Sequence, residues 1–290
     1  MNEVAQCICK SSAHLYFSIR GFNIFRCTNC SLTFVSPRLI DFGIYNGDYF
    51  FGAVHGFGFV NYEEDKSASS GYLKTYLKWL ENFGISKGST LLDIGAANGF
   101  FVNLAKEHGY ISAGVELSNE AVEWAKKLGR NVTQADAMQI SVNKKFDVIT
   151  VLDVLEHLSE PQEFISKVKE NLKPGGILLI NVPNIGSIFA KISGKSWHSF
   201  VPPEHLFYFN KRSLTEMLVS NCYEIVKIKS ISKTFKLSYI YKTIINSPQI
   251  STKIKRILKL INPVIDTKLG EIKIYLPLFD NLTIVARVTK

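Results

Sequence analysis

The chain has 290 residues, of which 46% are hydrophobic and 20% are charged, and its net charge is +9. This length allows a full α/β core together with a small second module. No stretch reaches the roughly 18 uninterrupted apolar residues of a transmembrane helix, and the N-terminus lacks the pattern of a signal peptide. We therefore expect a cytoplasmic protein.

Four of the five cysteines lie within residues 1–40. Cys7 and Cys9 are separated by one residue, whereas Cys27 and Cys30 are separated by two. Two cysteine pairs on tight turns can present four thiolates tetrahedrally to zinc, which holds together a segment too short for its own core. Residues 1–40 are thus predicted to form a zinc-ribbon-like module. The alternative is free thiols in a reducing compartment, where disulfides are rare.

Residues 41–70 combine aromatic side chains with glycines. Two interpretations remain open for them. They form either a lid that closes over cofactor and acceptor, or a linker whose aromatic rings pack on the main domain. The following residues, 72–83, carry apolar side chains at helical spacing, which predicts an amphipathic helix that covers a sheet.

Residues 91–99 read Leu-Leu-Asp-Ile-Gly-Ala-Ala-Asn-Gly. The pattern predicts a buried strand over 90–94, a glycine turn, and a helix over 100–108. Glycine lets the N-terminus of that helix and its bare backbone approach a ligand. Glu116 ends the next apolar run, where a carboxylate can accept both hydroxyl protons of a ribose.

The spacing of this motif argues against a dinucleotide-binding fold. Three residues separate Gly95 from Gly99, with Ala97 in the middle, so the chain lacks the Gly-x-Gly-x-x-Gly pattern. Asp93 lies just before the turn, where it would repel a pyrophosphate and attract a cationic sulfonium and amino group. The sequence therefore predicts a cationic, nucleoside-containing cofactor.

On these residues the chain resembles the class I S-adenosylmethionine-dependent methyltransferases, over most of residues 70–230. Residues 146–158 resemble the fourth strand of that family and its exit, and residues 172–182 resemble the turn and the fifth strand. The resemblance implies S-adenosylmethionine as cofactor. It also implies an α/β, Rossmann-like fold with a seven-stranded, mostly parallel sheet and a final antiparallel strand. The cofactor-binding residues that it implies are Asp93, Gly95, Ala97, Gly99, Phe100, Glu116, Leu117, Asp136, Ala137 and Asp153.

The sequence departs from the pattern of this family at two places. Ala97 stands where many members carry glycine. Deoxysugar C-methyltransferases of this family begin with a four-cysteine zinc-binding module, usually with two Cys-x-x-Cys pairs, and so support zinc at Cys7, Cys9, Cys27 and Cys30. The one-residue spacing of the first pair departs from that pattern.

The acceptor site is expected outside the carboxyl ends of the fourth and fifth strands. The resemblance to deoxysugar C-methyltransferases implies that His205 removes a proton from the acceptor, with Glu204 as its partner, and His157 and Tyr49 are further catalytic candidates by position. A histidine suits this role because its pKa lies near neutrality. The alternative is a structural role for the Glu-His pair. Ubiquinone-pathway O-methyltransferases offer another interpretation, in which Glu156 and His157 bind a metal.

The C-terminal part carries the positive charge. Residues 227–273 contain eleven basic and two acidic residues, which accounts for the net charge of the whole chain. Helix-spaced apolar residues accompany them, so residues 231–275 are predicted to be a basic helical insertion between the last two strands. The insertion either contacts an anionic membrane, attracts a nucleotide-sugar pyrophosphate, or is a solvated helical pair. Few aromatic residues accompany the charge, which argues against nucleic acid. Cys222, before the first of these strands, is expected to be a small core residue.

The sequence thus predicts a methyltransferase domain over residues 71–290 that acts on a small-molecule acceptor. By resemblance the acceptor is a sugar, or a nucleotide- or lipid-linked sugar, methylated on oxygen or carbon, and a quinone-like or lipid metabolite is the alternative. A protein that uses the fold only for binding or regulation is the competing class. The sequence does not determine the oligomeric state.

Overall fold

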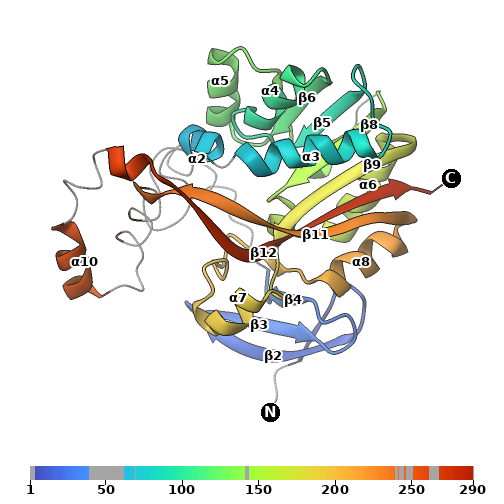
Figure 1. The fold of residues 1–290 in the computed structure, drawn as a ribbon. Helices are drawn as coiled ribbons and strands as arrows, with labels where there is room; N and C mark the ends of the chain where they lie inside the picture. Colours follow the sequence, from blue (N-terminus) through green and yellow to red (C-terminus); the bar gives the residue numbers. More distant parts are fainter. Residues whose placement is uncertain are drawn as a thin grey trace.

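The computed structural model describes residues 4–38, 62–68, 70–140, 144–238, 241, 245, 251–260 and 268–289. Within these ranges the chain forms a large mixed sheet flanked by helices and a smaller antiparallel sheet beside it (Figure 1). The predicted aromatic and glycine-rich part of the linker or lid, including Tyr49, lies outside the described residues.

The larger sheet has seven strands in the order β11-β12-β9-β8-β5-β6-β7. Strands β5 to β9 pair in parallel, and β12 pairs antiparallel with both β9 and β11. This topology confirms the predicted Rossmann-like sheet with an antiparallel strand near its end. The strands are β5 (Thr90–Ile94), β6 (Ile111–Glu116), β7 (Val132–Gln134), β8 (Phe146–Leu152), β9 (Leu172–Pro183), β11 (Tyr223–Lys236) and β12 (Lys273–Val288).

Helices cover both faces of this sheet. On β8, Val148 packs in one cluster with α3 (Ser70–Asn82) and α4 (Phe100–Glu107). Its neighbour Ile149 points to the other face, where it belongs to the cluster that contains residues of α6 (Pro161–Glu170) and α8 (Lys211–Ser220). Strands buried on both faces become continuous apolar runs, which is the pattern that the sequence shows.

Two further helices lie near the glycine turn. Helix α2 (Tyr62–Ala68) precedes α3, and α5 (Asn119–Lys127) follows β6. The predicted amphipathic helix over 72–83 corresponds to α3, and its apolar stripe is core: Tyr76, Leu77 and Leu80 are fully buried.

The smaller sheet joins segments that are far apart in the sequence. Its order is β1-β2-β3-β4-β10, and each pair is antiparallel. The first four strands come from the cysteine-containing N-terminus: β1 (Val4–Gln6), β2 (Ser12–Ile19), β3 (Phe22–Cys27) and β4 (Thr33–Val35). The fifth, β10 (Phe207–Tyr208), comes from the segment between β9 and α8, which also contains α7 (Ile188–Ser193). The N-terminal segment and the predicted acceptor segment therefore share one sheet.

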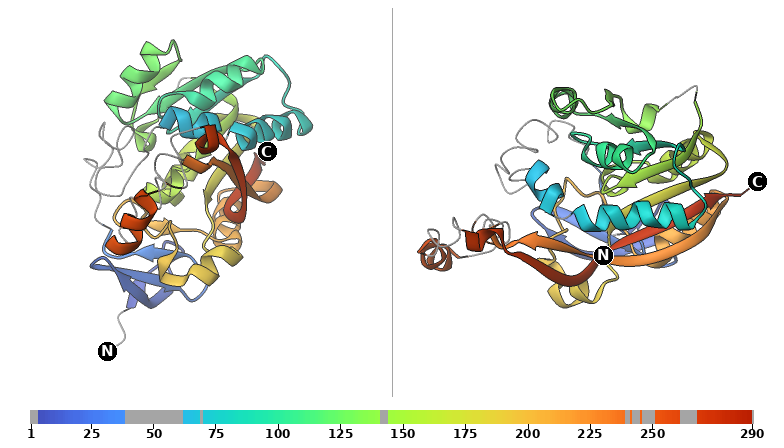
Figure 2. Two further views of the ribbon diagram at one scale, coloured as in Figure 1. Left: turned by 60° about the vertical axis from the view of Figure 1, so that its left-hand side comes forward. Right: turned by 45° about the horizontal axis from the view of Figure 1, so that its top comes forward.

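Strands β11 and β12 extend beyond the rest of the large sheet. Strand β9 pairs with β12 only over residues 281–287, whereas the β11–β12 pairing continues out to Lys236 and Lys273. Figures 1 and 2 show this two-stranded ribbon as an arm that carries α10 (Thr252–Lys259) near its end. Among the described residues, no helix is both long and apolar enough to cross a membrane.

One expectation about the core is wrong. Cys222 is exposed, in the turn between α8 and β11, and its φ of +60° is a left-handed conformation. The chain reverses there, and the carbonyl of Cys222 accepts hydrogen bonds from the backbone and side chain of Thr289. The residue therefore belongs to a surface turn.

Candidate active site

The turn between β5 and α4 requires glycine at two positions. Gly95 and Gly99 have φ values of +73° and +74°, a region that side chains with a Cβ rarely adopt. A Cβ on Gly95 would collide with the side chain of Val154, and one on Gly99 would lie 2.7 Å from Cγ2 of Val132. The sequence predicts glycine here because the backbone must approach a ligand. In the structure, packing within the protein is already enough to exclude larger residues at both positions.

Ala97 adopts a similar left-handed conformation, with φ of +49°. For alanine such a conformation costs on the order of 1 kcal/mol more than for glycine. The Ala97 methyl group is buried and packs against Ala121 of α5, with Tyr62 and Trp124 beside it. This apolar contact offsets part of the backbone cost, so the turn keeps its geometry although the third glycine is absent.

Glu116 ends β6 and holds the turn from the neighbouring strand. Its Oε2 accepts a hydrogen bond from Ala97 N at 2.8 Å, and its Oε1 accepts from Leu117 N at 2.8 Å and Ser118 N at 3.0 Å. Burial raises the pKa of Glu116, and these three N–H groups act against that rise. A carboxylate has about four lone-pair positions, so acceptor capacity remains for one hydroxyl group of a ligand.

Asp93, on β5, is a buried carboxyl group next to this turn. Its side chain is 3% exposed and accepts a hydrogen bond from Thr150 Oγ1 at 2.6 Å. Burial raises the pKa of Asp93 to about 7, and the nearby Glu116 adds to the rise, whereas Thr150 and Lys66 oppose it. A cation bound beside Asp93 would favour its ionised form, because opposite charges attract strongly away from water.

Helix α2 is attached to the turn by a group of polar contacts. Arg130 donates to both oxygens of Glu63, at 2.8 and 2.7 Å, and Asn98 Nδ2 donates to Glu63 Oε2 at 2.6 Å. Two-point pairing of this kind fixes orientation as well as distance. The sequence analysis missed Glu63 and Arg130, because no local spacing pairs residues that are 67 positions apart.

Lys66, also on α2, is a third residue that was not predicted from the sequence. Its ammonium group lies 3.7 Å from Asp153 Oδ2 and donates to Tyr72 OH at 3.3 Å. Asp153 follows β8 with a φ of +57°, and its Oδ1 accepts from Asn181 Nδ2 at 2.5 Å. Helix α2 thereby brings a cation to the carboxyl ends of the central strands.

The remaining predicted cofactor residues lie around the same sheet edge. Asp136 follows β7, and its side chain accepts from Met138 N at 2.8 Å, which caps the short 3-10 helix η3 (Ala137–Gln139). Phe100 begins α4 and lies under the guanidinium of Arg130, 5.6 Å from its ring centre. These positions are compatible with contact to a ligand above β5, β6 and β7.

On the acceptor side, two predicted catalytic residues come together. The rings of His157 and His205 pack edge to face, with centres 4.7 Å apart. Nδ1 of His157 lies 2.9 Å from the carbonyl of Glu204, and Nδ1 of His205 lies 2.9 Å from the carbonyl of Ser199. A carbonyl only accepts, so each Nδ1 carries the proton and each Nε2 keeps a lone pair. Glu204 thus contacts His157 through its backbone carbonyl.

Burial sets the protonation state of both rings. It lowers the pKa of His157 to about 4 and the pKa of His205 well below its ordinary value. Both are therefore neutral at pH 7. Glu156 is almost fully buried beside them, and one oxygen of Glu156 lies within 4.8 Å of ring nitrogens of both histidines. Two imidazoles and a carboxylate at this separation can bind either an acidic proton or a divalent cation.

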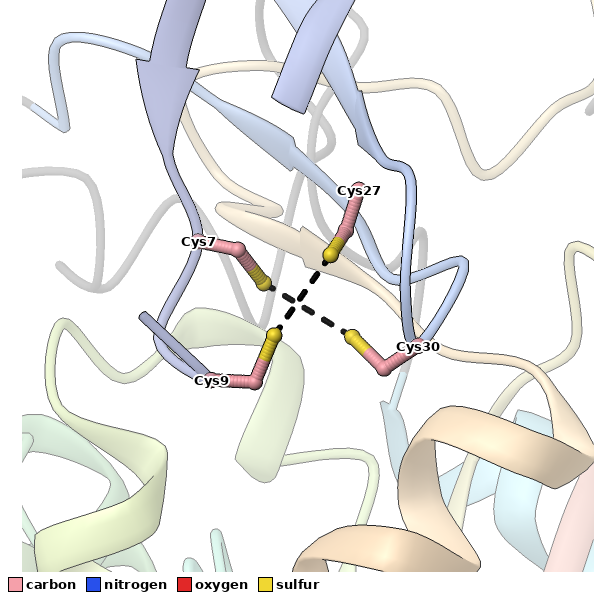
Figure 3. Close-up of side chains that lie close together, drawn as sticks. All are labelled: Cys7, Cys9, Cys27 and Cys30. Carbon is pink, nitrogen blue, oxygen red and sulfur yellow. Dashed lines mark hydrogen bonds between the residues drawn. The ribbon is translucent and has the colours of Figure 1, made fainter. Parts of the chain in front are cut away.

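The four N-terminal cysteines converge on one point (Figure 3). The Sγ atoms of Cys7 and Cys30 are 3.7 Å apart, those of Cys9 and Cys27 are 3.5 Å apart, and all four lie within 4.8 Å of one another. Zinc–sulfur bonds of about 2.3 Å place the sulfurs of a regular tetrahedron about 3.8 Å apart. The contact with Cys7 lowers the pKa of Cys30 to about 5. These residues fit a tetrahedral thiolate site, and the short Cys-x-Cys spacing does not prevent convergence.

Comparisons with known proteins agree with this geometry. A family model described as a methyltransferase domain matches residues 66–228. The ubiquinone biosynthesis O-methyltransferase of Coxiella burnetii is 30% identical over 121 residues, which cover 37% of this chain and 49% of that protein. The corresponding protein of Haemophilus ducreyi is 29% identical over 109 residues, covering 33% and 46%. The chain thus spans about half the length of the curated relatives that it matches.

Solved structures share the fold. Magnesium protoporphyrin IX methyltransferase from Synechocystis, determined with bound S-adenosylhomocysteine, is 15% identical with a TM-score of 0.52, and the match covers 83% of this chain and 97% of that one. A S-adenosylmethionine-dependent methyltransferase from Archaeoglobus fulgidus is 23% identical with a TM-score of 0.50, covering 77% and 97%. At these identities the similarity concerns the fold.

Proposed function

Because the chain belongs to the methyltransferase domain family, we propose that it binds S-adenosylmethionine and transfers its methyl group to a small-molecule acceptor. Membership of that family confirms the resemblance drawn from the glycine motif. The observation that carries the proposal is the placement of two buried carboxyl groups around the glycine turn, Asp93 on β5 and Glu116 at the tip of β6.

Each residue of the cofactor side has a distinct task in this proposal. Glu116 accepts a hydrogen bond from one ribose hydroxyl group while it holds Ala97 in place. Asp93 lies in a buried position that favours a cation over an anion. Helix α2, attached through Glu63 and Arg130, covers the turn and excludes water. Bound S-adenosylmethionine would supply an electrophilic methyl group on a sulfonium, so the remaining task of the chain is alignment and proton removal.

We propose His205 as the residue that takes the proton of the acceptor. Its Nδ1 is held by Ser199, and its neutral ring presents Nε2 as the basic atom. His157 packs against it and is held in the same tautomer by Glu204. A neutral imidazole whose orientation is fixed by a carbonyl presents its lone pair to a hydroxyl or an acidic carbon. Burial lowers the pKa of His205, so it is a weaker base than the near-neutral histidine expected from the sequence. Tyr49 stays a candidate by position.

A second candidate role for this part of the site is the binding of a divalent cation. Glu156, His157 and His205 offer one carboxylate and two Nε2 atoms, and both Nδ1 atoms donate to carbonyls, as is usual for metal-bound histidine. His205→Ala and Glu156→Gln separate the two roles. Under the base hypothesis Glu156→Gln keeps both the activity and the metal content of the native protein, whereas under the metal hypothesis Glu156→Gln loses the activity together with one bound divalent cation.

We propose a sugar, or a nucleotide- or lipid-linked sugar, as the acceptor, methylated on oxygen or carbon. The support is the Glu204-His205 pair and the four-cysteine module, which together resemble the deoxysugar C-methyltransferases. The relatives named as ubiquinone biosynthesis O-methyltransferases favour a quinone-like or lipid acceptor instead. A panel of nucleotide sugars and hydroxylated quinones, scored by formation of S-adenosylhomocysteine, distinguishes these classes.

The arm adds a membrane partner to the proposal. Helix α10 has four basic residues and no acidic one, and Ile257 and Leu260 are 65% and 78% exposed. A basic surface with exposed aliphatic residues suits an anionic bilayer, and such contact would serve a lipid-linked acceptor. Vesicles containing phosphatidylglycerol should sediment the protein, whereas phosphatidylcholine vesicles should not.

Charge variants test the membrane contact. Neutralising Lys255, Arg256 and Lys259 to glutamine should weaken the affinity for phosphatidylglycerol vesicles by about 100-fold, at about fivefold for each cation near the surface. Neutralising Lys126 and Lys127 on α5 is the matched control and should leave it unchanged. Equal sedimentation with both vesicle types, or with none, contradicts the membrane contact.

The first experiment on the cofactor is calorimetric titration of the purified chain with S-adenosylmethionine and S-adenosylhomocysteine. Glu116→Ala should abolish saturable binding, whereas Glu123→Ala, an exposed carboxylate on α5, should preserve it. Binding without turnover on every acceptor class would favour the binding or regulatory alternative. Absence of binding to either compound would reject the proposed function.

A further inference from the structure

The cysteine module and the acceptor segment are joined through their backbones. Strand β10 pairs with β4, with Phe207 opposite Phe34 and Tyr208 opposite Thr33. Val35 N donates to the carbonyl of Leu206 at 2.9 Å. Leu206 N in turn donates to the carbonyl of Glu156 at 2.9 Å, so Leu206 is bound on one side by the module and on the other by the segment after β8.

His205 precedes this doubly bound residue. Its ring is placed by the backbone on which it stands and by the carbonyl of Ser199, which belongs to the same segment. Movement of β10 relative to β4 is therefore expected to displace His205, and His157 with it, because hydrogen bonds of Leu206 to Glu156 and of His157 to Glu204 join the two segments. The position of the proposed base depends on the position of β4.

Side-chain packing joins the same two parts. Phe17 of β2 packs edge to face on Phe200 with ring centres 5.0 Å apart, and Phe34 lies 6.3 Å from Phe207. A buried cluster combines residues of the module with residues from α7 to β10. Its buried members are Phe17, Ile24, Val35, Ala190, Trp197, Phe200 and Tyr208.

The cysteine site lies at the end of the module that holds β4. Cys27 ends β3, its N–H donates to the carbonyl of Leu32 at 2.9 Å, and the turn passes through Cys30 and Ser31. The carbonyl of Ser31 then accepts from Asn210 Nδ2 at 2.9 Å. A segment of this size has little core of its own, so a closed metal site is what fixes such a turn.

We propose that metal binding by the four cysteines positions residues 199–210, and with them His205, so that the module serves as a frame for the acceptor side of the site. The cofactor side depends instead on the parallel strands and on the attachment of α2 by Glu63 and Arg130. Release of the metal is therefore expected to loosen the acceptor segment while the cofactor site stays formed. This inference rests on the proposed function only for the role of His205.

Hydrogen–deuterium exchange on the full chain tests the proposal without a known acceptor. Purified protein should contain one zinc per chain, measured by mass spectrometry of the metal. Removal of zinc by a chelator should raise exchange about tenfold or more in peptides covering residues 33–35 and 204–209, with little change over residues 90–97 and 111–116. Added zinc should restore the original exchange.

A pair of substitutions at Cys9 controls for general damage. Cys9 is the most exposed of the four ligands, so a larger side chain can be accommodated there. Cys9→Ser should lose zinc and show the exchange pattern of the chelated protein, whereas Cys9→His, which keeps a zinc ligand, should retain both zinc and protection. Calorimetric affinity for S-adenosylhomocysteine should stay within about threefold in both variants.

Several outcomes would overturn the proposal. These are unchanged protection over 204–209 after complete loss of zinc, an equal loss of protection across the whole chain, and purified protein without bound metal. Failure of the proposed function has a different signature, namely absence of cofactor binding in the zinc-loaded protein, so the two ideas fail separately.

Discussion

Replacement of Asp93 by asparagine tests how the chain recognises a cationic cofactor. Asp93 is buried, and burial raises its pKa to about 7. A cationic ligand beside it stabilises the carboxylate, so binding should expel the proton that Asp93 carries at acidic pH. The variant has the same shape, cannot ionise, and should neither release this proton nor attract the cation.

The expected size follows from the pKa. With a pKa of about 7, about 0.9 of the Asp93 side chains carry a proton at pH 6 and about 0.1 at pH 8. Binding at pH 6 should therefore release about 0.9 proton, and affinity should rise about tenfold, or about 1.4 kcal/mol, between pH 6 and pH 8. Without ligand, the stability of the chain depends on pH with the opposite sign. Because the pKa of Asp93 is higher in the folded than in the unfolded chain, its contribution to the free energy of unfolding decreases as pH rises toward 7.

Calorimetry in buffers of different ionisation enthalpy measures the released proton. The α-amino group of the ligand also titrates, so the quantity of interest is the difference between the native chain and Asp93→Asn. Asp147→Asn is the control, because that carboxylate pairs with Lys173 at the opposite end of the strands. Equal proton release in the native chain and Asp93→Asn, or an affinity difference that does not change with pH, would refute the reasoning.

Three further predictions concern packing and attachment. Gly95→Ala should destabilise the chain by about 2–4 kcal/mol, because it adds a left-handed alanine and a clash with Val154, and Val154→Ala should restore part of the loss in urea denaturation. Arg130→Leu should release Glu63, raise hydrogen exchange over residues 62–68 and weaken the affinity for S-adenosylhomocysteine about tenfold. If Glu63 and Arg130 act together, the Glu63→Gln, Arg130→Leu double variant should bind S-adenosylhomocysteine as well as the Arg130→Leu variant does. Unchanged exchange in the Arg130→Leu variant would reject the coupling. Tyr76→Phe should cost about 0.5–1.5 kcal/mol, because Asn181 Oδ1 loses the Tyr76 hydroxyl and keeps Thr283 Oγ1 as a donor. Tyr16→Phe, on an exposed ring, should cost almost nothing, and equal denaturation midpoints for the two variants would contradict this.

The sequence predicts the cofactor half of the site because the residues of that prediction are local. The strand, the glycine turn and the following helix occupy 18 consecutive positions, 90–107, and Glu116 ends the adjacent strand. A parallel βαβ unit has one handedness, so this order of elements also fixes where the residues meet in space. The fold class came from the resemblance to the methyltransferase family that these residues carry.

Contacts between distant segments could not be predicted from the sequence. The attachment of α2 depends on Glu63 and Arg130, which are brought together only when α2 lies over the turn. The expectation for Cys222 failed for a similar reason: an apolar side chain between a helix and a strand is buried or exposed according to how the chain turns there. Neither outcome leaves a periodic signal.

By itself the sequence determined the strand, turn and helix of the glycine motif, since apolar periodicity and glycine spacing act within single elements and their neighbours. The seven-stranded sheet was implied by the family resemblance that this motif carries. Only the tertiary structure showed that the N-terminal cysteines and His205 belong to one sheet, since β10 is two residues long and has no recognisable pattern. The pairing of His157 with His205 was likewise decided by packing, because a separate backbone carbonyl holds each ring in place and burial keeps both rings neutral.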